Sequence, residues 1–180
     1  VGGLFNSVDA INVYHIAQWS VPVPGHFNIT VIPEGFYNSN SNKLSQSDEF
    51  ELELHDGIFP YEIVESSFAN VDSVTLTGNF QITNAPTGSY YLVVKHRNSI
   101  ETWSSSIVNY VAGNIVNYNF NSSLTQAFGS NMIQVDTSPV RFAIYSGDVN
   151  QDNIIDAGDL SQVENDIDFS GYISSDVNGD

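Results

Sequence analysis

Residues 49–55 read Glu-Phe-Glu-Leu-Glu-Leu-His, a strict alternation of polar and apolar side chains. Successive side chains of a β-strand point to opposite faces, so this pattern predicts a strand with one buried face. Phe50, Leu52 and Leu54 should enter a core, while the three glutamates and His55 should form a solvated face. Carboxylates in such a row can also be glycosidase acids, but a solvated face is their usual role.

Short segments of the same kind flank this strand on both sides. Phe27, Ile29 and Val31 alternate with polar partners, and further strands are predicted at 61–67, 71–77, 79–83, 89–96, 107–111, 114–120, 131–135 and 139–145. Glycine and proline break the pattern between them. Short strands with a turn every 8 to 12 residues or so indicate an antiparallel Ig-like β-sandwich over residues 21–146.

One strand of this region carries a family signature. Residues 80–94 read Phe-Gln-Ile-Thr-Asn-Ala-Pro-Thr-Gly-Ser-Tyr-Tyr-Leu-Val-Val. This stretch resembles the P-x-G-x-Y-x-L/V-x-V strand of the carboxypeptidase-regulatory or Cna B-type sandwich. The resemblance implies a non-catalytic β-sandwich of the kind found in stalks, adhesins and enzyme accessory modules.

Residues 148–159 carry a second pattern, Asp-Val-Asn-Gln-Asp-Asn-Ile-Ile-Asp-Ala-Gly-Asp. Oxygen side chains fall at loop positions 1, 3, 5, 9 and 12, and position 7 would give a backbone carbonyl; these residues are Asp148, Asn150, Asp152, Asp156, Asp159 and Ile154. This is the ligand spacing of an EF-hand loop and predicts bound Ca²⁺, a hard cation with oxygen ligands. Position 6 is Asn153, a residue tolerant of the left-handed conformation that the turn requires. The alternative is a solvated acidic turn.

The sequence around this loop resembles a type I dockerin, the two-repeat calcium module of secreted bacterial proteins. The motif is GDVNQDNIIDAGDL at 147–160, followed by an amphipathic helix carrying Leu160, Val163 and Ile167, and SDVNGD at 175–180 repeats its start. The resemblance implies two calcium sites and, in cellulosomal relatives, docking to a cohesin. The hydroxyl and basic residues of cohesin-binding members are replaced here by Ala157, Gly158, Glu164 and Asn165.

The two ends of the sequence resemble two halves of one further loop. Asp176, Asn178 and Asp180 would take positions 1, 3 and 5, while Leu4, Asn6 and Asp9 would take positions 7, 9 and 12. A helix carrying Val13, Ile16 and Trp19 should follow the second half. The alternative is that residues 1–19 are an ordinary amphipathic helix or strand.

If the halves meet, they complete a second, split calcium site. Within one chain they would close a circularly permuted dockerin. Between chains they would link subunits head to tail, and such a heterologous contact gives a filament unless it closes into a ring.

The charge of the chain limits its partners. There are 21 acidic and 4 basic residues, a net charge of −17, and nine of the acids fall within residues 148–180. This balance argues against nucleic acid and against anionic membrane surfaces. No apolar run has the length of a membrane span, and no signal peptide is visible, so a mature or excised segment is expected. The Asn/Ser/Thr-rich, lysine-poor composition suits an extracellular or cell-surface bacterial protein.

Catalytic patterns are weak. The four histidines lack zinc-ligand spacing, and the serine run at 104–106 lacks a nucleophile-elbow context. Basic and aromatic residues gather once, where Trp103 follows Arg97, and these two side chains are candidates for a sugar contact. The alternative is that Trp103 packs in the sandwich.

These patterns divide the chain into a half dockerin-like repeat with a helix (1–20), a β-sandwich (21–146) and a dockerin-like repeat plus the start of a second loop (147–180). We expect a mainly β, non-catalytic extracellular module that binds Ca²⁺ and associates with itself or with another surface protein. The alternative is a carbohydrate-binding or dockerin-type anchoring module of a secreted glycan-degrading enzyme, with a polysaccharide as its partner.

Overall fold

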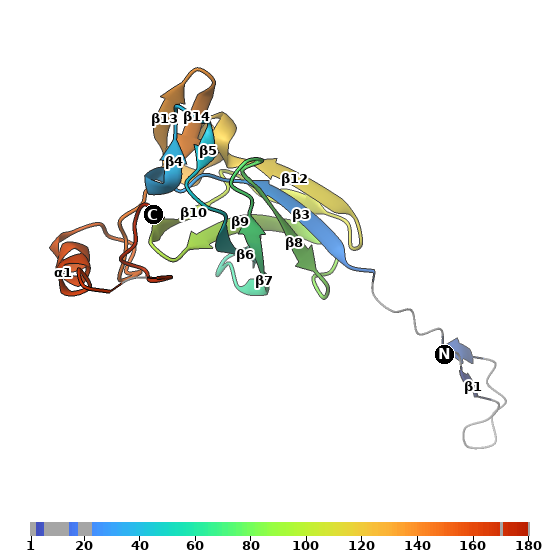
Figure 1. Ribbon diagram of the computed structural model, residues 1–180. Helices are drawn as coiled ribbons and strands as arrows, with labels where there is room; N and C mark the ends of the chain where they lie inside the picture. Colours follow the sequence, from blue (N-terminus) through green and yellow to red (C-terminus); the bar gives the residue numbers. More distant parts are fainter. Residues whose placement is uncertain (1–2, 6–14, 18–22, 170, 180) are drawn as a thin grey trace.

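The computed structural model describes residues 3–5, 15–17, 23–169 and 171–179, which form a mainly β structure (Figure 1). Its strands are β1 (Gly3–Phe5), β2 (His15–Ala17), β3 (Gly25–Thr30), β4 (Tyr37–Asn38), β5 (Lys43–Leu44), β6 (Asp48–Asp56), β7 (Ile63–Val71), β8 (Thr77–Ile82), β9 (Gly88–His96), β10 (Ser99–Trp103), β11 (Val108–Tyr110), β12 (Ile115–Asn119), β13 (Ile133–Thr137) and β14 (Val140–Ala143). Its helices are α1 (Ala157–Asn165) and four short 3₁₀ turns, η1 (Glu34–Phe36), η2 (Phe120–Ser122), η3 (Leu124–Gln126) and η4 (Phe128–Ser130).

Two sheets build the sandwich. One has the strand order β10-β9-β6-β7, with β11 also pairing with β9, and the other has the order β12-β3-β8. The core between them joins apolar side chains from both sheets: Phe27, Ile29, Phe80 and Ile82 from one, and Phe50, Leu52, Leu54, Leu92 and Val94 from the other. The mainly β sandwich predicted from the alternating pattern is therefore confirmed. One pairing departs from the antiparallel prediction, because β12 runs parallel to β3.

The strand quoted at 49–55 is the central strand β6, but its outer face is not simply solvated. Phe50, Leu52 and Leu54 enter the core as predicted. On the other face, however, Glu53 is only 5% exposed and His55 is buried. The prediction of a solvated row was wrong at these two positions, because neighbouring strands place Lys95 against Glu53 and the ring of Trp103 against His55.

The predicted strand at 71–77 is a turn. β7 ends at Val71. The side chain of Asp72 then accepts hydrogen bonds from the backbone nitrogens of Val74 (3.0 Å) and Thr75 (2.7 Å). This local capping by an aspartate competes with strand pairing, so the chain reverses before β8.

The described residues near the start of the chain form strands rather than the predicted helix. β1 and β2 pair antiparallel, with Leu4 opposite Ile16. The helix prediction is wrong at Ile16, where strand pairing satisfies the backbone groups instead. Val13 and Trp19 lie outside the described residues, and the division at 1–20, 21–146 and 147–180 otherwise stays a prediction.

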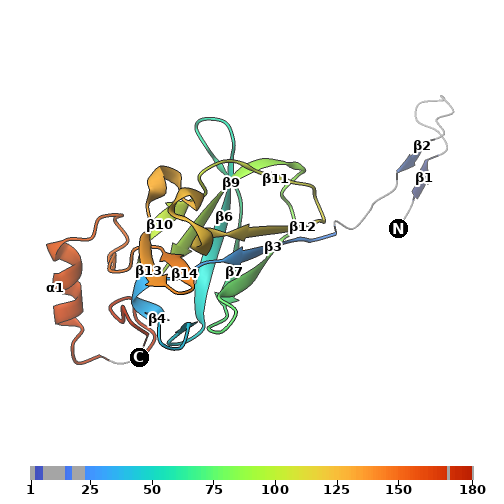
Figure 2. The same ribbon diagram turned by 90° about the horizontal axis from the view of Figure 1, so that it is seen from above.

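The helix predicted after the acidic loop is α1. Asp156 caps it, accepting a hydrogen bond from the backbone nitrogen of Gly158 (2.6 Å), while Asp159 accepts one from the nitrogen of Asp156 (2.9 Å). This reciprocal capping box fixes where the helix begins. Leu160 and Ile167 are nevertheless exposed, and Ile167 lies beyond the helix end. Figures 1 and 2 both place α1 beside one end of the sandwich.

Candidate metal centre and its attachment to the sandwich

The first predicted ligand, Asp148, is at the centre of a tightly wrapped loop. The residue is 1% exposed, and its carboxylate accepts hydrogen bonds from the backbone nitrogens of Asp152 (3.1 Å) and Asn153 (3.0 Å). The chain can turn this sharply because Gln151 and Asn153 adopt positive φ angles of 61° and 66°. Asn153, at position 6, thus adopts the left-handed conformation that the sequence predicted for it.

Asp159, the predicted last ligand, closes the loop from the first turn of α1. It is 3% exposed and accepts hydrogen bonds from the backbone nitrogens of Val149 (2.7 Å) and Asn150 (3.1 Å) as well as Asp156. The pKa of Asp159 is lowered, chiefly by the hydrogen bond from the backbone nitrogen of Asp156. Position 1 and position 12 therefore approach each other across the loop.

The loop concentrates negative charge in a place with little solvent. Burial raises the pKa of Asp148, and the nearby carboxylates of Asp159 and Asp152 add to the rise against the two backbone hydrogen bonds. A buried carboxylate beside two others is costly unless a cation balances it.

The remaining predicted ligands point at the loop's own polar groups. Asn150 donates from Nδ2 to Asp152 Oδ2 (3.1 Å), and the other Asp152 oxygen accepts from the nitrogen of Ile154 (3.0 Å). Asp156 is exposed and engaged in capping α1.

The donor chemistry of this loop fits Ca²⁺, since all six predicted donors are oxygens. The side chains of these donors, however, are not gathered into a complete coordination site. Within the part of the chain that the structure describes, no three His, Cys, Asp or Glu side chains stand together as a metal-holding group. Calcium binding therefore stays a prediction, based on the donor set and on the two buried carboxylates.

The turn between β9 and β10 attaches this loop to the sandwich. The carbonyl oxygen of Asn98 accepts a hydrogen bond from the nitrogen of Gly147 (2.7 Å), directly before the loop. Gln151 Nε2 donates to the carbonyl of Asp148 (2.7 Å) and lies 3.5 Å from that of Ser99. The start of the candidate calcium loop is thus held against the sheet.

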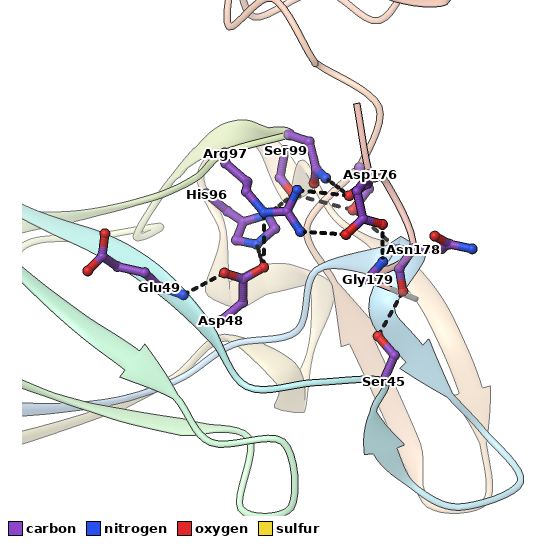
Figure 3. A network of polar contacts seen from close by, with 12 residues as sticks. Ser45, Asp48, Glu49, His96, Arg97, Ser99, Asp176, Asn178 and Gly179 are labelled. Carbon is purple, nitrogen blue, oxygen red and sulfur yellow. Dashed lines mark hydrogen bonds and ion pairs between the residues drawn. The ribbon is translucent and has the colours of Figure 1, made fainter. Parts of the chain in front are cut away.

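Arg97, from the same turn, binds the second loop start (Figure 3). Its guanidinium donates to Asp48 Oδ2 (3.1 Å), to Asp176 Oδ2 (3.1 Å) and to the carbonyl oxygens of Asp176 and Ile173. It also lies over the rings of Phe36 (5.2 Å) and Tyr172 (4.6 Å). Arg97 is therefore an internal ion-pair residue, and its prediction as a sugar contact finds no support in this placement.

Asp48 completes the Arg97 site from inside the sandwich. It is buried and also accepts from the backbone nitrogen of Glu49 (2.8 Å), with His96 Nε2 at 3.3 Å. Burial alone would raise the pKa of Asp48, but hydrogen bonds from His96, from the Tyr172 hydroxyl and from the Glu49 amide hold it well below its usual range. The sequence held one hint of this cluster. Arg97 is one of only four basic residues in a chain with 21 acidic ones, so acidic partners for it were to be expected.

The second loop start is docked along the same edge. Asn98 Nδ2 donates to the carbonyl of Asp176 (2.7 Å), Gly179 donates from its nitrogen to Asp176 Oδ1 (2.7 Å), and Ser45 Oγ donates to the carbonyl of Asn178 (2.7 Å). The carboxylate predicted as a metal ligand is thus already paired with a guanidinium.

The other half of the predicted split site is not brought to Asp176. Leu4 lies in β1, which Figures 1 and 2 both draw at the opposite end of the molecule. Asn6, Asp9 and Asp180 lie outside the described residues. A split site closed by two chains stays a prediction.

Trp103 lies away from these loops, at the far end of β10 and on the outer face of the five-stranded sheet. It is half-buried, its Nε1 donates to Glu101 Oε1 (2.6 Å), and its ring contacts His55 at a centroid distance of 4.4 Å. It therefore faces outward rather than into the core between the sheets.

Comparisons with known proteins give a distant likeness of fold. No protein family and no curated protein matches the chain. The solved structures that are similar to it include two interface mutants of a type II cohesin–X–dockerin complex from Acetivibrio cellulolyticus. The C-terminal interface mutant has 14% identity and a TM-score of 0.46 over 87% of this chain and 85% of that one. The N-terminal interface mutant has 16% identity and a TM-score of 0.41 over 89% of this chain and 86% of that one.

Among the described residues, no helix is long and apolar enough to span a membrane.

Proposed function

We propose that this protein is a non-catalytic extracellular structural module whose loop at 148–159 binds Ca²⁺. The supporting observation is the pair of buried carboxylates, Asp148 and Asp159, each held by backbone nitrogens of the loop. Side-chain oxygens of Asn150, Asp152 and Asp156 and the carbonyl of Ile154 would complete the ligand set.

Calcium would supply the positive charge that this loop lacks. The loop's backbone nitrogens already orient Asp148 and Asp159, so the chain would lose little further conformational entropy when calcium binds. Binding to the folded loop alone adds free energy to folding, and calcium therefore acts as a stabiliser of residues 147–179 rather than as a catalyst.

Assembly is the second part of the proposal. Five large apolar side chains of the calcium-loop region are exposed: Ile154, Ile155, Leu160, Ile167 and Phe169. Apolar surface of this kind beside a folded domain suits contact with another protein. A second copy, contributing Leu4, Asn6 and Asp9 to Asp176, Asn178 and Asp180, would give a head-to-tail contact.

The calcium assignment is tested by titrating the purified chain with CaCl₂ in a calorimeter. Wild type should bind with measurable heat, and calcium at about a hundred times Kd should stabilise folding by about 2.7 kcal/mol. Asp148→Ala should lose the heat and the stabilisation that belong to this loop. The matched control is Asp168→Asn, an exposed acid outside the ligand positions. Equal calcium binding by wild type and Asp148→Ala would remove the site from this loop.

A second candidate function is carbohydrate binding or dockerin-type anchoring for a secreted glycan-degrading enzyme. The observation that favours it is the group of aromatic side chains around Trp103 on the outer sheet face. This surface is separate from the calcium loop, so both functions are compatible in one module.

A further inference from the structure

A cluster of aromatic side chains covers one end of the outer sheet face. We call Phe59, Tyr61, Tyr91 and Trp103 the aromatic cluster. The Tyr61 ring lies 5.7 Å from that of Tyr91, 6.4 Å from that of Trp103 and 6.0 Å from that of Phe59, and the Tyr91 and Trp103 rings are 6.0 Å apart. Phe59 is 80% exposed and Ile58 beside it is also open to solvent. Exposed aromatic surface of this kind is typical of binding faces.

A buried polar network fixes this cluster from below. Glu53 lies 2.8 Å from His55 Nε2 and accepts a hydrogen bond from Lys95 Nζ (3.0 Å). Lys95 also pairs with Glu101 (3.4 Å), which holds the Trp103 indole nitrogen. Burying a carboxylate is costly, and here its partners lock the strand residues under the rings. The network therefore positions Trp103 and leaves Lys95 and Glu101 at its polar edge.

The loop before β7 presents Tyr61 in an unfavourable backbone conformation. Its φ is 61°, which is rare for a bulky side chain. His55 Nδ1 lies 2.8 Å from the Tyr61 carbonyl oxygen and so ties this loop to the same network. Backbone strain of this kind concentrates at functional sites.

We propose that the aromatic cluster binds a neutral polysaccharide; the inference deepens the second candidate function and is independent of calcium. Aromatic rings offer apolar faces to the C–H faces of sugar rings. Lys95 and Glu101, at the edge of Trp103, offer a hydrogen-bond donor and acceptor for hydroxyl groups. The chain's net charge of −17 disfavours polyanionic glycans. An open sheet face suits an extended chain rather than a single enclosed sugar.

The test is affinity electrophoresis of the whole chain in gels containing hydroxyethylcellulose, glucomannan or arabinoxylan. Wild type should be retarded by at least one of these, and Trp103→Ala should bind at least about tenfold more weakly. Phe59→Ala, at a side chain too exposed to support the core, should also weaken retardation and guards against misfolding of the first variant. Phe169→Ala, an exposed aromatic residue outside the cluster, should behave as wild type.

Three outcomes would overturn the proposal. They are free migration of wild type in all three gels, unchanged retardation of both cluster variants, and dissociation of a dimer by Trp103→Ala in size-exclusion chromatography, which would make the cluster an interface between copies. Runs with EGTA and with Asp148→Ala separate the two functions. Retardation should persist in both, whereas calcium binding should not.

Discussion

At the scale of single residues, Arg97 joins parts of the chain that are far apart in sequence. Its partners Asp48 and Asp176 are separated from it by 49 and 79 positions. Two carboxylates, two backbone carbonyl groups and two aromatic rings converge on one guanidinium. A planar donor with several N–H groups can satisfy this set, and a lysine cannot.

Replacing Arg97 should therefore loosen the C-terminal segment. Arg97→Ala removes the guanidinium that pairs with the buried Asp48 and should lower the free energy of unfolding by about 3 kcal/mol in urea titration. Arg97→Lys should recover only part of this loss. Lys43→Ala, at an exposed lysine on β5, is the control and should change little. A wild-type unfolding curve for Arg97→Ala would show that the ion pairs do not contribute.

The lowered pKa of Asp48 should make the stability of the fold depend on acidic pH. Its folded pKa is lowered, so its ionised form stabilises the fold at pH values above the ordinary carboxyl pKa of about 4. That contribution should disappear as the pH falls through this value toward the lowered folded pKa. Asp48→Asn should be less stable at about pH 6 and should lose less stability on acidification to about pH 3 than wild type. Parallel pH profiles for the two proteins would contradict this role.

At the scale of elements, the segment 171–179 is held against η1 by close backbone contact. A side-chain carbon added at Gly35 would collide with the carbonyl oxygen of Val177, and one added at Gly179 would meet Phe36 and Ser45. Two glycines thus permit the approach that brings Asp176 to Arg97. The requirement is for space at Gly35 and for both space and a positive φ of 69° at Gly179.

Gly35→Ala should displace this segment without unfolding the sandwich. The backbone carbonyl of Val177 cannot yield as a flexible side chain would, so docking should weaken. Limited proteolysis should cut within residues 171–179 at least about tenfold faster than in wild type, since cleavage follows the population of the open segment. Glu34→Ala, one position earlier, is the control. Equal cleavage rates would mean that the segment can shift to accept the methyl group.

At the scale of the whole molecule, charge should control association. The net charge of −17 repels a second copy, and nine of the acids lie in residues 148–180 where the proposed contact forms. Calcium bound there would remove part of this repulsion and would also bridge oxygen ligands from two chains. Simple salt would screen the repulsion but would not form this bridge.

We therefore expect oligomers in CaCl₂ that EGTA dissociates and that about 0.3 M NaCl does not restore, measured by light scattering on a size-exclusion column. Asp9→Ala and Asp176→Ala should both give monomers in calcium. Asp168→Asn should still assemble. A wild-type monomer in calcium at all concentrations would exclude the head-to-tail contact, while leaving the calcium site itself to the calorimetric test.

The sequence by itself determined what depends on local spacing. Phe50, Leu52 and Leu54 enter the core because a strand alternates its faces, and Asn153 takes a left-handed turn because the loop requires one. Helix α1 starts where Asp156 can cap it. The helix predicted through Ile16 failed, since a short apolar pattern fits strand or helix until a pairing partner decides.

Only the tertiary structure decided what depends on distant neighbours. Alternation cannot tell whether Lys95 will cover Glu53, so the outer face of β6 was expected to be solvated although half of it is buried. Nor can it tell that Arg97 turns toward Asp48 and Asp176 while Trp103 joins Tyr61 and Tyr91. Local patterns fix which side chains face inward, whereas ion pairs and aromatic contacts form between strands whose neighbours are set by the whole fold.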